Sequence, residues 1–261
     1  MNYVGLITVR TSSSRLKNKC LLYLNKNIRV IEHIVLRCLR FSISPIICTT
    51  NNKKDDVLIK IANKFGIQYF RGSEKNKILR WHDCAKKFNI NYFHTIDADD
   101  LYFDPISIKD SIKLAIDKKA DLILPSKVSR TGGASEGYTF SQKGIEKLRK
   151  NLNIYSHKNI DLFDTEMIDS FIDDSNLKQY LFKGKSYEFK GKIRFTLDYR
   201  EDFKMFKLLF KEFGIYENRK KINEYLRKNK KILKINFFKN KLWDKKQKNF
   251  KIPKKNDKKF S

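Results

Sequence analysis

The sequence is poor in cysteine, and the few cysteines that it has are not closely paired. All four lie in the first third of the chain, without any C-x-x-C spacing: Cys20, Cys38, Cys48 and Cys84. This arrangement offers no thiolate zinc site and no disulfide framework of the kind that small secreted proteins use. We therefore expect a reduced protein of the cytoplasm.

Long apolar stretches are missing too. The run YVGLITV, residues 3–9, is too short for a signal peptide. No later run approaches the roughly 20 apolar residues that a membrane-spanning helix needs. The G-x-x-x-x-G-K-S/T pattern of a Walker phosphate loop is also absent. We therefore expect no membrane span and no Walker-type nucleotide site.

Positive charge, in contrast, is abundant, with a net charge of +28. Residues 218–261 hold 18 Lys and Arg against three acids, a net charge of +15. Such a surplus suggests nucleic acid as a partner, but lysine heavily outnumbers arginine, the residue that grips phosphates and bases bidentately. A chain rich in Lys, Asn and Ile can also reflect codon usage. We expect no specific nucleic-acid partner, and we divide the chain into a domain of residues 1–217 and a basic C-terminal helix and tail of residues 218–261.

Short β-branched runs alternate with amphipathic helical patterns along the chain. The pattern predicts helices near residues 29–41, 55–66, 76–88, 107–119 and 220–231, and strands at residues 3–9, 45–50, 67–70, 91–97 and 120–125. Near residues 193–213 it predicts a further strand, a turn and a helix. The alternation indicates an α/β fold with a mostly parallel central sheet and helices on both faces.

Polar clusters follow the first four predicted strands, and the carboxyl ends of parallel strands share one edge of a sheet. The first cluster, VRTSSSRLKNK at residues 9–19, places Arg10, Arg15, Lys17 and Lys19 around three serines. Guanidinium forks, point charges and backbone N–H groups on one loop suit the phosphates of a nucleotide. The alternative is a solvated basic loop.

Two acidic segments are candidates for holding a metal. HTIDADD places Asp97, Asp99 and Asp100 at the end of a strand, and FTLDYRED places Asp198 before a helix. Closely spaced carboxylates suit Mg²⁺, which also takes phosphate oxygens. An acidic turn that caps a helix is the alternative for the first segment, and helix capping is the expected role of Glu201 and Asp202.

These segments resemble the nucleotide-sugar cytidylyltransferases, the acylneuraminate, CMP-KDO synthetase and spore-coat polysaccharide types. Residues 9–19 are similar to the family's signature P/Q-A-R-x-x-S-S/T-R-L-P-G-K. Further similar segments follow in the family's order over residues 3–236: CTTNNKKDD, RGSEKNKILRW, DADDLYFDP, LDYREDF and NEYLRKNKKILKIN. The chain departs from the family at Lys17-Asn18, where the family has Pro-Gly, and at Arg200, where it has Pro. The charged residues of the motifs remain, which favours an active enzyme.

The resemblance implies a nucleotide-diphospho-sugar transferase fold, GT-A-like and Rossmann-type. It implies transfer of CMP from CTP to an acidic sugar of the sialic or KDO kind, with release of pyrophosphate, for surface polysaccharide biosynthesis by a homodimer. Asp99 and Asp198 would hold Mg²⁺. The catalytic cations would be Arg10, Arg15 and Lys19, and the substrate would be bound by Ser14, Thr50, Arg71, Ser73 and Arg80. Residues 132–138 resemble the acceptor loop.

Two other functions remain open from the sequence. A GT-A-type glycosyltransferase would use a nucleotide sugar through the aspartates of DADD, although it would release no pyrophosphate for the loop of residues 9–19 to bind. A basic anion-binding protein would use the C-terminal tail, and its affinity would fall steeply with salt.

Overall fold

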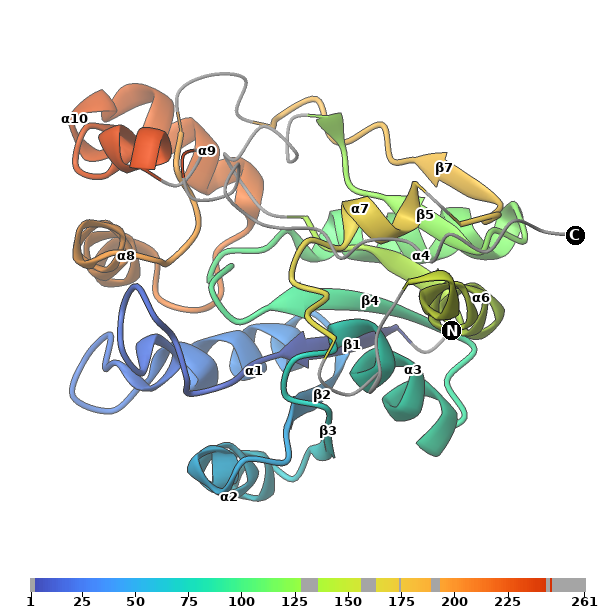
Figure 1. Ribbon diagram of the computed structural model, residues 1–261. Coiled ribbons are helices and arrows are strands. Elements are labelled where there is room, and N and C mark those ends of the chain that lie inside the picture. The colour runs from blue at the N-terminus through green and yellow to red at the C-terminus, as the bar shows by residue number, and fades with distance from the viewer. Residues whose placement is uncertain are drawn as a thin grey trace, which may run out of the picture.

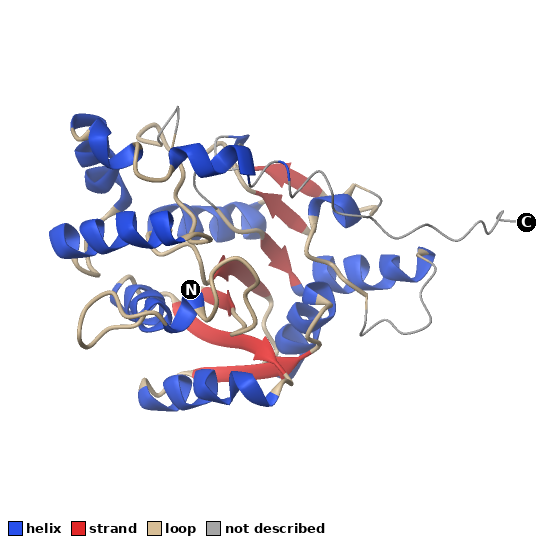
Figure 2. Cartoon of the chain, turned by 60° about the vertical axis from the view of Figure 1, so that its left-hand side comes forward, coloured by secondary structure: helices blue, strands red, loops and turns tan. Residues whose placement is uncertain are grey.

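A seven-stranded sheet forms the centre of the computed structural model, which describes residues 3–127, 136–155, 163–173, 175–188, 193–242 and 245. The strand order is β3-β2-β1-β4-β6-β5-β7, and every strand pair is parallel except those made by β6. The strands are β1 Val4–Thr8, β2 Ser44–Thr50, β3 Gln68–Gly72, β4 Tyr92–Asp97, β5 Leu122–Leu124, β6 Thr139–Ser141 and β7 Gln179–Leu181. Figure 2 shows this twisted sheet running between two groups of helices. The predicted fold class is therefore confirmed.

The helices cover both faces of the sheet (Figure 1). They are α1 Val30–Arg40, α2 Asp56–Lys64, α3 Lys77–Lys87, α4 Pro105–Asp117, α6 Gln142–Asn151, α7 Asp169–Ile172, α8 Arg200–Phe213, α9 Arg219–Lys228 and α10 Lys230–Leu233. One core packs α1, α2, α4, α8 and α9 against the sheet, and a second packs α3, α6 and α7 against it. Among the described residues, no helix is long and apolar enough to cross a membrane.

The predicted strand near residue 193 is wrong, because residues 193–199 form neither strand nor helix. Phe195 and Leu197, apolar members of I-R-F-T-L, are buried as the alternation suggests, but the charged Arg194 is buried as well. Their backbone, however, bonds to a loop and a side chain instead of a neighbouring strand. The Leu197 N–H donates to the Asp99 carbonyl at 3.0 Å, and Asn236 donates to the Arg194 carbonyl at 2.9 Å. This segment thereby lies beside the loop that follows β4.

The C-terminal helices pack on the same core as the rest of the sheet. Ile222 and Leu226 of α9 are fully buried in the core that also contains residues of α1 and α8. The described residues beyond 218 therefore contribute to the packing of the sheet domain. The predicted division of the chain at residue 218 stays a prediction.

Two histidines are buried in a way that couples stability to pH. His33 Nε2 donates to the Leu101 carbonyl at 2.9 Å, and His94 Nδ1 bonds the Thr139 hydroxyl at 2.8 Å. Burial lowers the pKa of each imidazole from 6.5 to about 3. Below pH 6.5 the unfolded chain therefore binds more protons than the folded one, so the free energy of unfolding falls as the pH drops from 6.5 towards 3.

We expect His94→Gln to reduce this pH dependence. Where the imidazole is protonated in the unfolded chain and neutral in the folded one, each such histidine changes the free energy of unfolding by about 1.4 kcal/mol per pH unit. Denaturant unfolding at about pH 5.5 and about pH 4.5 should show that slope missing from the variant, relative to the unmodified protein. Equal slopes in the two proteins would contradict the assignment of His94 as a neutral group.

Candidate active site

The loops that follow several strands meet around one cavity at the carboxyl-terminal edge of the sheet. The cavity has a volume of about 260 Å³. The loop after β1, the end of β4 and the first turn of α3 form its wall. The charged side chains that line it are Arg10, Arg15, Lys19, Lys77, Arg80, Asp97, Asp99 and Glu166. The cavity lies where the sequence analysis expects a ligand.

Lys19 joins the two aspartates that were predicted to hold a metal. Its Nζ donates to Asp99 Oδ2 at 2.6 Å and to Asp198 Oδ1 at 2.9 Å. Arg15 donates to the same Oδ1 of Asp198 at 2.8 Å. The structure thus brings together four predicted site residues that are up to 183 positions apart in the sequence.

Burial and charge oppose each other at this cluster. Burial alone would raise the pKa of Asp198, but the charges of Lys19 and Arg15 outweigh it and lower the pKa below the ordinary value of 3.8. Burial alone would lower the pKa of the Lys19 ammonium, but the charges of Asp99 and Asp198 outweigh this effect and raise the pKa above its ordinary value. Asp198 and Lys19 are therefore both ionised at neutral pH.

The loop reaches Lys19 through an unusual backbone conformation at Asn18. Asn18 has φ of 54° and ψ of 32°, the left-handed region that favours glycine. Asparagine adopts this region more readily than most other non-glycine residues. The short helix η1 Lys19–Leu21 begins directly after it. The replacement of the family's glycine by Asn18 therefore keeps the turn that delivers Lys19 to the carboxylates.

Three aspartates at the end of β4 form a compact acidic group. Carboxylate oxygens of Asp97, Asp99 and Asp100 all lie within 4.8 Å of one another. Burial is the largest influence on Asp97 and raises its pKa, with Asp99 adding to the effect and Lys77 opposing it. Hard oxygen donors gathered in this way suit a divalent cation such as Mg²⁺.

Two cations of α3 complete the cavity, and the sequence analysis named only one of them. Arg80 is buried and donates to the Ser73 carbonyl at 2.6 Å. Lys77 lies 3.6 Å from both Asp97 and Glu166, and these carboxylates raise its pKa against the effect of burial. The signal for Lys77 was its i, i+3 spacing from Arg80 at the start of a predicted helix. Glu166 carried no such signal.

Three of the predicted substrate-binding residues lie outside the cavity wall. The buried Thr50 hydroxyl bonds Asp55. Arg71 donates to the Thr50 and Asn52 carbonyls at 3.0 and 2.9 Å, and Ser73 Oγ accepts from the Asn76 N–H. These contacts hold the loops after β2 and β3. Ser14, in contrast, lines the cavity, and a substrate contact for each of these residues stays a prediction.

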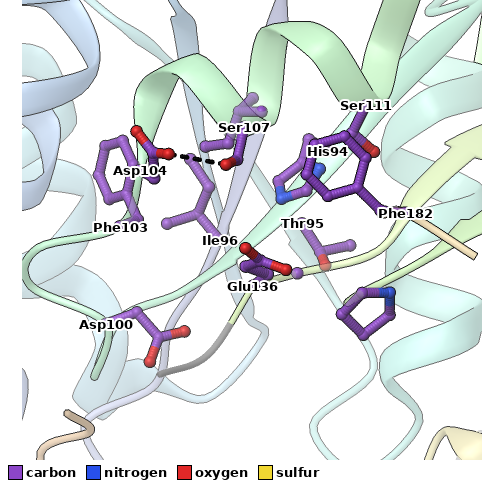
Figure 3. A pocket seen from close by; sticks show the side chains of 13 residues that line it. His94, Thr95, Ile96, Asp100, Phe103, Asp104, Ser107, Ser111, Glu136 and Phe182 are labelled. Atoms are coloured by element: carbon purple, nitrogen blue, oxygen red, sulfur yellow. Dashed lines mark hydrogen bonds between the residues drawn. The ribbon is translucent and has the colours of Figure 1, made fainter. Parts of the chain in front are cut away.

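A second cavity of about 20 Å³ lies next to the acidic group and shares Asp100 with it. Figure 3 shows Asp100 and Glu136 at this pocket, with Asp104 bonded to Ser107. Burial and the neighbouring Glu188 raise the pKa of Glu136 to about 7. A Cβ at Gly137 would lie 1.7 Å from the Thr95 carbonyl oxygen, so glycine is needed where the chain runs against β4. Of the predicted acceptor loop, residues 132–135 lie outside the described residues.

The sheet, the cationic loop after β1 and the acidic group after β4 together define a nucleotidyltransferase. The chain belongs to the cytidylyltransferase family, because the family model described as Cytidylyltransferase matches residues 4–235. Over 249 residues it is 31% identical to the uncharacterized protein MJ1063 of Methanocaldococcus jannaschii, a match that covers 90% of this chain and 95% of that protein. The predicted family and enzyme class are confirmed.

Solved structures show the same fold. A cytidylyltransferase from Leptospira borgpetersenii aligns with a TM-score of 0.75 and 22% identity, covering 89% of this chain and 97% of that one. CMP:2-keto-3-deoxy-manno-octonic acid synthetase, solved in complex with CTP, aligns with a TM-score of 0.61 and 10% identity, covering 81% of this chain and 99% of that one. At these identities the likeness establishes the fold alone.

Proposed function

We propose that this enzyme transfers CMP from CTP to an acidic sugar of the sialic or KDO kind and releases pyrophosphate, as a cytoplasmic homodimer that serves surface polysaccharide biosynthesis. The observation that carries the proposal is that two cations of the cavity wall contact these carboxylates: Lys19 contacts Asp99, which lines the cavity, and both Lys19 and Arg15 contact Asp198 behind it. Phosphate-binding cations and metal-binding carboxylates at one place are what transfer of a nucleotidyl group requires. The synthetase solved with CTP has the same fold.

The carboxylates fit Mg²⁺. Asp99 and Asp198 converge on one cationic centre, the ammonium of Lys19, at 2.6 and 2.9 Å. The oxygens of Asp97 and Asp100 lie close to Asp99. Mg²⁺ prefers one or two carboxylates together with phosphate oxygens, so Asp99 and Asp198 would hold it. When bound, the ion would neutralise phosphate oxygens and polarise the α-phosphate.

The cations of the cavity would act on the triphosphate. Arg10, Arg15 and Lys19 would bind the β- and γ-phosphates and stabilise the charge that develops on departing pyrophosphate. The acceptor hydroxyl would attack the α-phosphorus and give up its proton to solvent, the new P–O bond would form, and pyrophosphate would leave with the electron pair of the bond that breaks. The reaction needs positioning and electrostatic stabilisation without a covalent enzyme intermediate.

Acceptor binding is proposed for the side of the sheet that carries β6. Gly137, the described end of the predicted acceptor loop, runs against β4 beside the acidic group. Lys77 and Arg80 supply positive charge on the cavity wall beyond the three cations assigned to the triphosphate. This surplus is the feature that favours an acceptor with a carboxylate over a neutral sugar.

A thermal-shift screen with CTP, UTP, GTP, ATP and UDP-sugars, each with Mg²⁺, tests the nucleotide assignment. We expect CTP to stabilise the protein selectively. At 100 times its dissociation constant a ligand adds about 2.7 kcal/mol, which is on the order of 5–10 °C in Tm for a chain of this size. The shift should vanish in Lys19→Ala and persist in Lys17→Ala, whose side chain is exposed on the same loop. Selective stabilisation by a UDP-sugar would instead identify a glycosyltransferase.

A further inference from the structure

Arg194 is fully enclosed directly behind the candidate active site. Its side chain is 0% exposed, and it does not line the 260 Å³ cavity. One guanidinium N–H donates to Asp198 Oδ2 at 3.1 Å, and Nε donates to Asp202 Oδ1 at 2.9 Å. The predicted roles for this part of the chain were metal binding by Asp198 and helix capping by Asp202. Neither of these roles includes the buried arginine between them.

The two oxygens of Asp198 are divided between the cavity and the interior. Oδ1 accepts from Lys19 and Arg15, which line the cavity, whereas Oδ2 accepts from Arg194. Asp202 adds a second constraint, because its Oδ2 accepts from the backbone N–H of Asp198 at 2.8 Å. The backbone N–H and Oδ2 of Asp198 are thus both held from the interior, which leaves Oδ1 directed at Lys19 and Arg15, two cations of the cavity wall.

The C-terminal segment of residues 236–240 holds Arg194 in turn. Asn240 Oδ1 accepts from the guanidinium at 3.1 Å. Asn236, which is fully buried, donates through Nδ2 to the Arg194 carbonyl and to Asp202 Oδ1, both at 2.9 Å. Both asparagines belong to the predicted basic C-terminal segment, in which Asn236 ends the family-like segment NEYLRKNKKILKIN, but neither was predicted to have a role at the site. In the structure they close the rear of the site.

We propose that Arg194 is a positioning residue that acts through Asp198, and that Asn236 and Asn240 belong to the same support. The proposal rests on the proposed function, in which Asp198 holds the metal. A ligand carboxylate must be held in one orientation, and partners behind a metal ligand typically affect metal affinity or activity by about 10- to 100-fold. The planar guanidinium can reach Asp198 and Asp202 together, which a lysine ammonium on a flexible stem does not reproduce.

Arg37 provides a matched control for a purely structural buried arginine. It too is 0% exposed, but its partners are the backbone carbonyls of Phe103, Ile215 and Glu217. None of these residues lines the 260 Å³ cavity. A loss of stability that substitutions of both arginines share therefore reports the burial of the side chain. A loss of Mn²⁺ affinity and kcat that only the Arg194 substitution causes reports the action of Arg194 on Asp198.

The test compares Arg194→Lys, Asn240→Leu and Arg37→Lys in the full chain. Mn²⁺ affinity is measured by electron paramagnetic resonance with CTP present, together with the thermal midpoint and with kcat and KM for CTP. We expect Arg194→Lys to weaken Mn²⁺ binding and lower kcat by about 10- to 100-fold, with little change in KM. Asn240→Leu should act in the same direction by a smaller factor, and Arg37→Lys should leave Mn²⁺ affinity and kcat unchanged.

Two results would overturn the proposal. One is a folded Arg194→Lys protein with the Mn²⁺ affinity and kcat of the unmodified enzyme, and the other is an equal loss in Arg37→Lys. Should Arg194→Lys fail to fold, Asn240→Leu decides by the same two measurements. If the proposed function itself is wrong, the unmodified protein will bind no CTP and release no pyrophosphate. That outcome is distinct from both results above, in which the unmodified enzyme is active.

Discussion

Asp99→Ala is expected to lower the rate of pyrophosphate release from CTP by about 100-fold or more, the scale of losing one preorganised electrostatic partner in an active site. Asp99 is a member of the compact acidic group and contacts Lys19 at 2.6 Å. Its loss removes one ligand of the proposed Mg²⁺ and one anchor of a phosphate-binding cation. Coupled detection of pyrophosphate, with CTP and an acidic sugar acceptor, measures the effect.

Asp117→Ala is the control for this substitution. Asp117 is an exposed acid at the end of α4 and does not line the cavity, so we expect normal turnover from it. Near-normal pyrophosphate release by Asp99→Ala would refute the metal assignment. A parallel loss in Asp117→Ala would show that the assay responds to general loss of acidic charge.

Lys19→Met is expected to have two effects of opposite sign. Without nucleotide, the Lys19 ammonium lies between Asp99 and Asp198, so a divalent cation must displace it in order to bind both carboxylates. Removing that positive charge should tighten Mn²⁺ binding to the free protein by on the order of tenfold or more, because close charges interact by a few kcal/mol near a protein surface. The same change removes a phosphate partner, so kcat/KM for CTP should fall by about 100-fold or more.

The binding of metal and nucleotide should therefore be coupled in the unmodified enzyme. In the proposed complex, CTP phosphates would offer Lys19 and Arg15 alternative partners, which would free the carboxylates for the cation. By linkage, the metal must then tighten CTP binding by the same factor. Titration of Mn²⁺ with and without CTP measures this factor, and we expect it to shrink in Lys19→Met but not in Lys17→Met. If Lys19→Met without nucleotide binds Mn²⁺ no more tightly than the unmodified protein does, the cation does not displace the Lys19 ammonium.

The strands that order the site were predictable, whereas the short edge strand β7 was not. The runs at residues 3–9, 45–50 and 91–97 are largely apolar because they form inner strands of a sheet covered on both faces, whereas the run at residues 67–70 forms the partly exposed edge strand β3. β7 has three residues and only parallel pairing with β5, so its formation depends on tertiary context. At residues 193–199 the same apolar alternation marked burial in a loop.

The cationic loop and the acidic group were predictable because both directly follow strands of the parallel sheet. The direction of each side chain was not. Arg71 was expected after its strand but lies within β3, and its guanidinium turns to the loop after β2. Lys77 enters the cavity from a helix, and Arg194 reaches Asp198 from a buried loop. Such directions depend on contacts between distant segments, which spacing along the chain does not encode.

The wide separation of the site's parts has a consequence for how the protein is made. Lys19 and Asp99 leave the ribosome early, but Asp198 follows much later and Asn240 later still, as a chain grows at roughly 5–20 residues per second. A nascent chain that has formed β1 to β4 already carries the cationic loop and the acidic group, yet it lacks the last carboxylate and its support. On the proposed function, such a chain could not yet hold metal and nucleotide together, so CTP would stabilise the finished protein and not the unfinished chain.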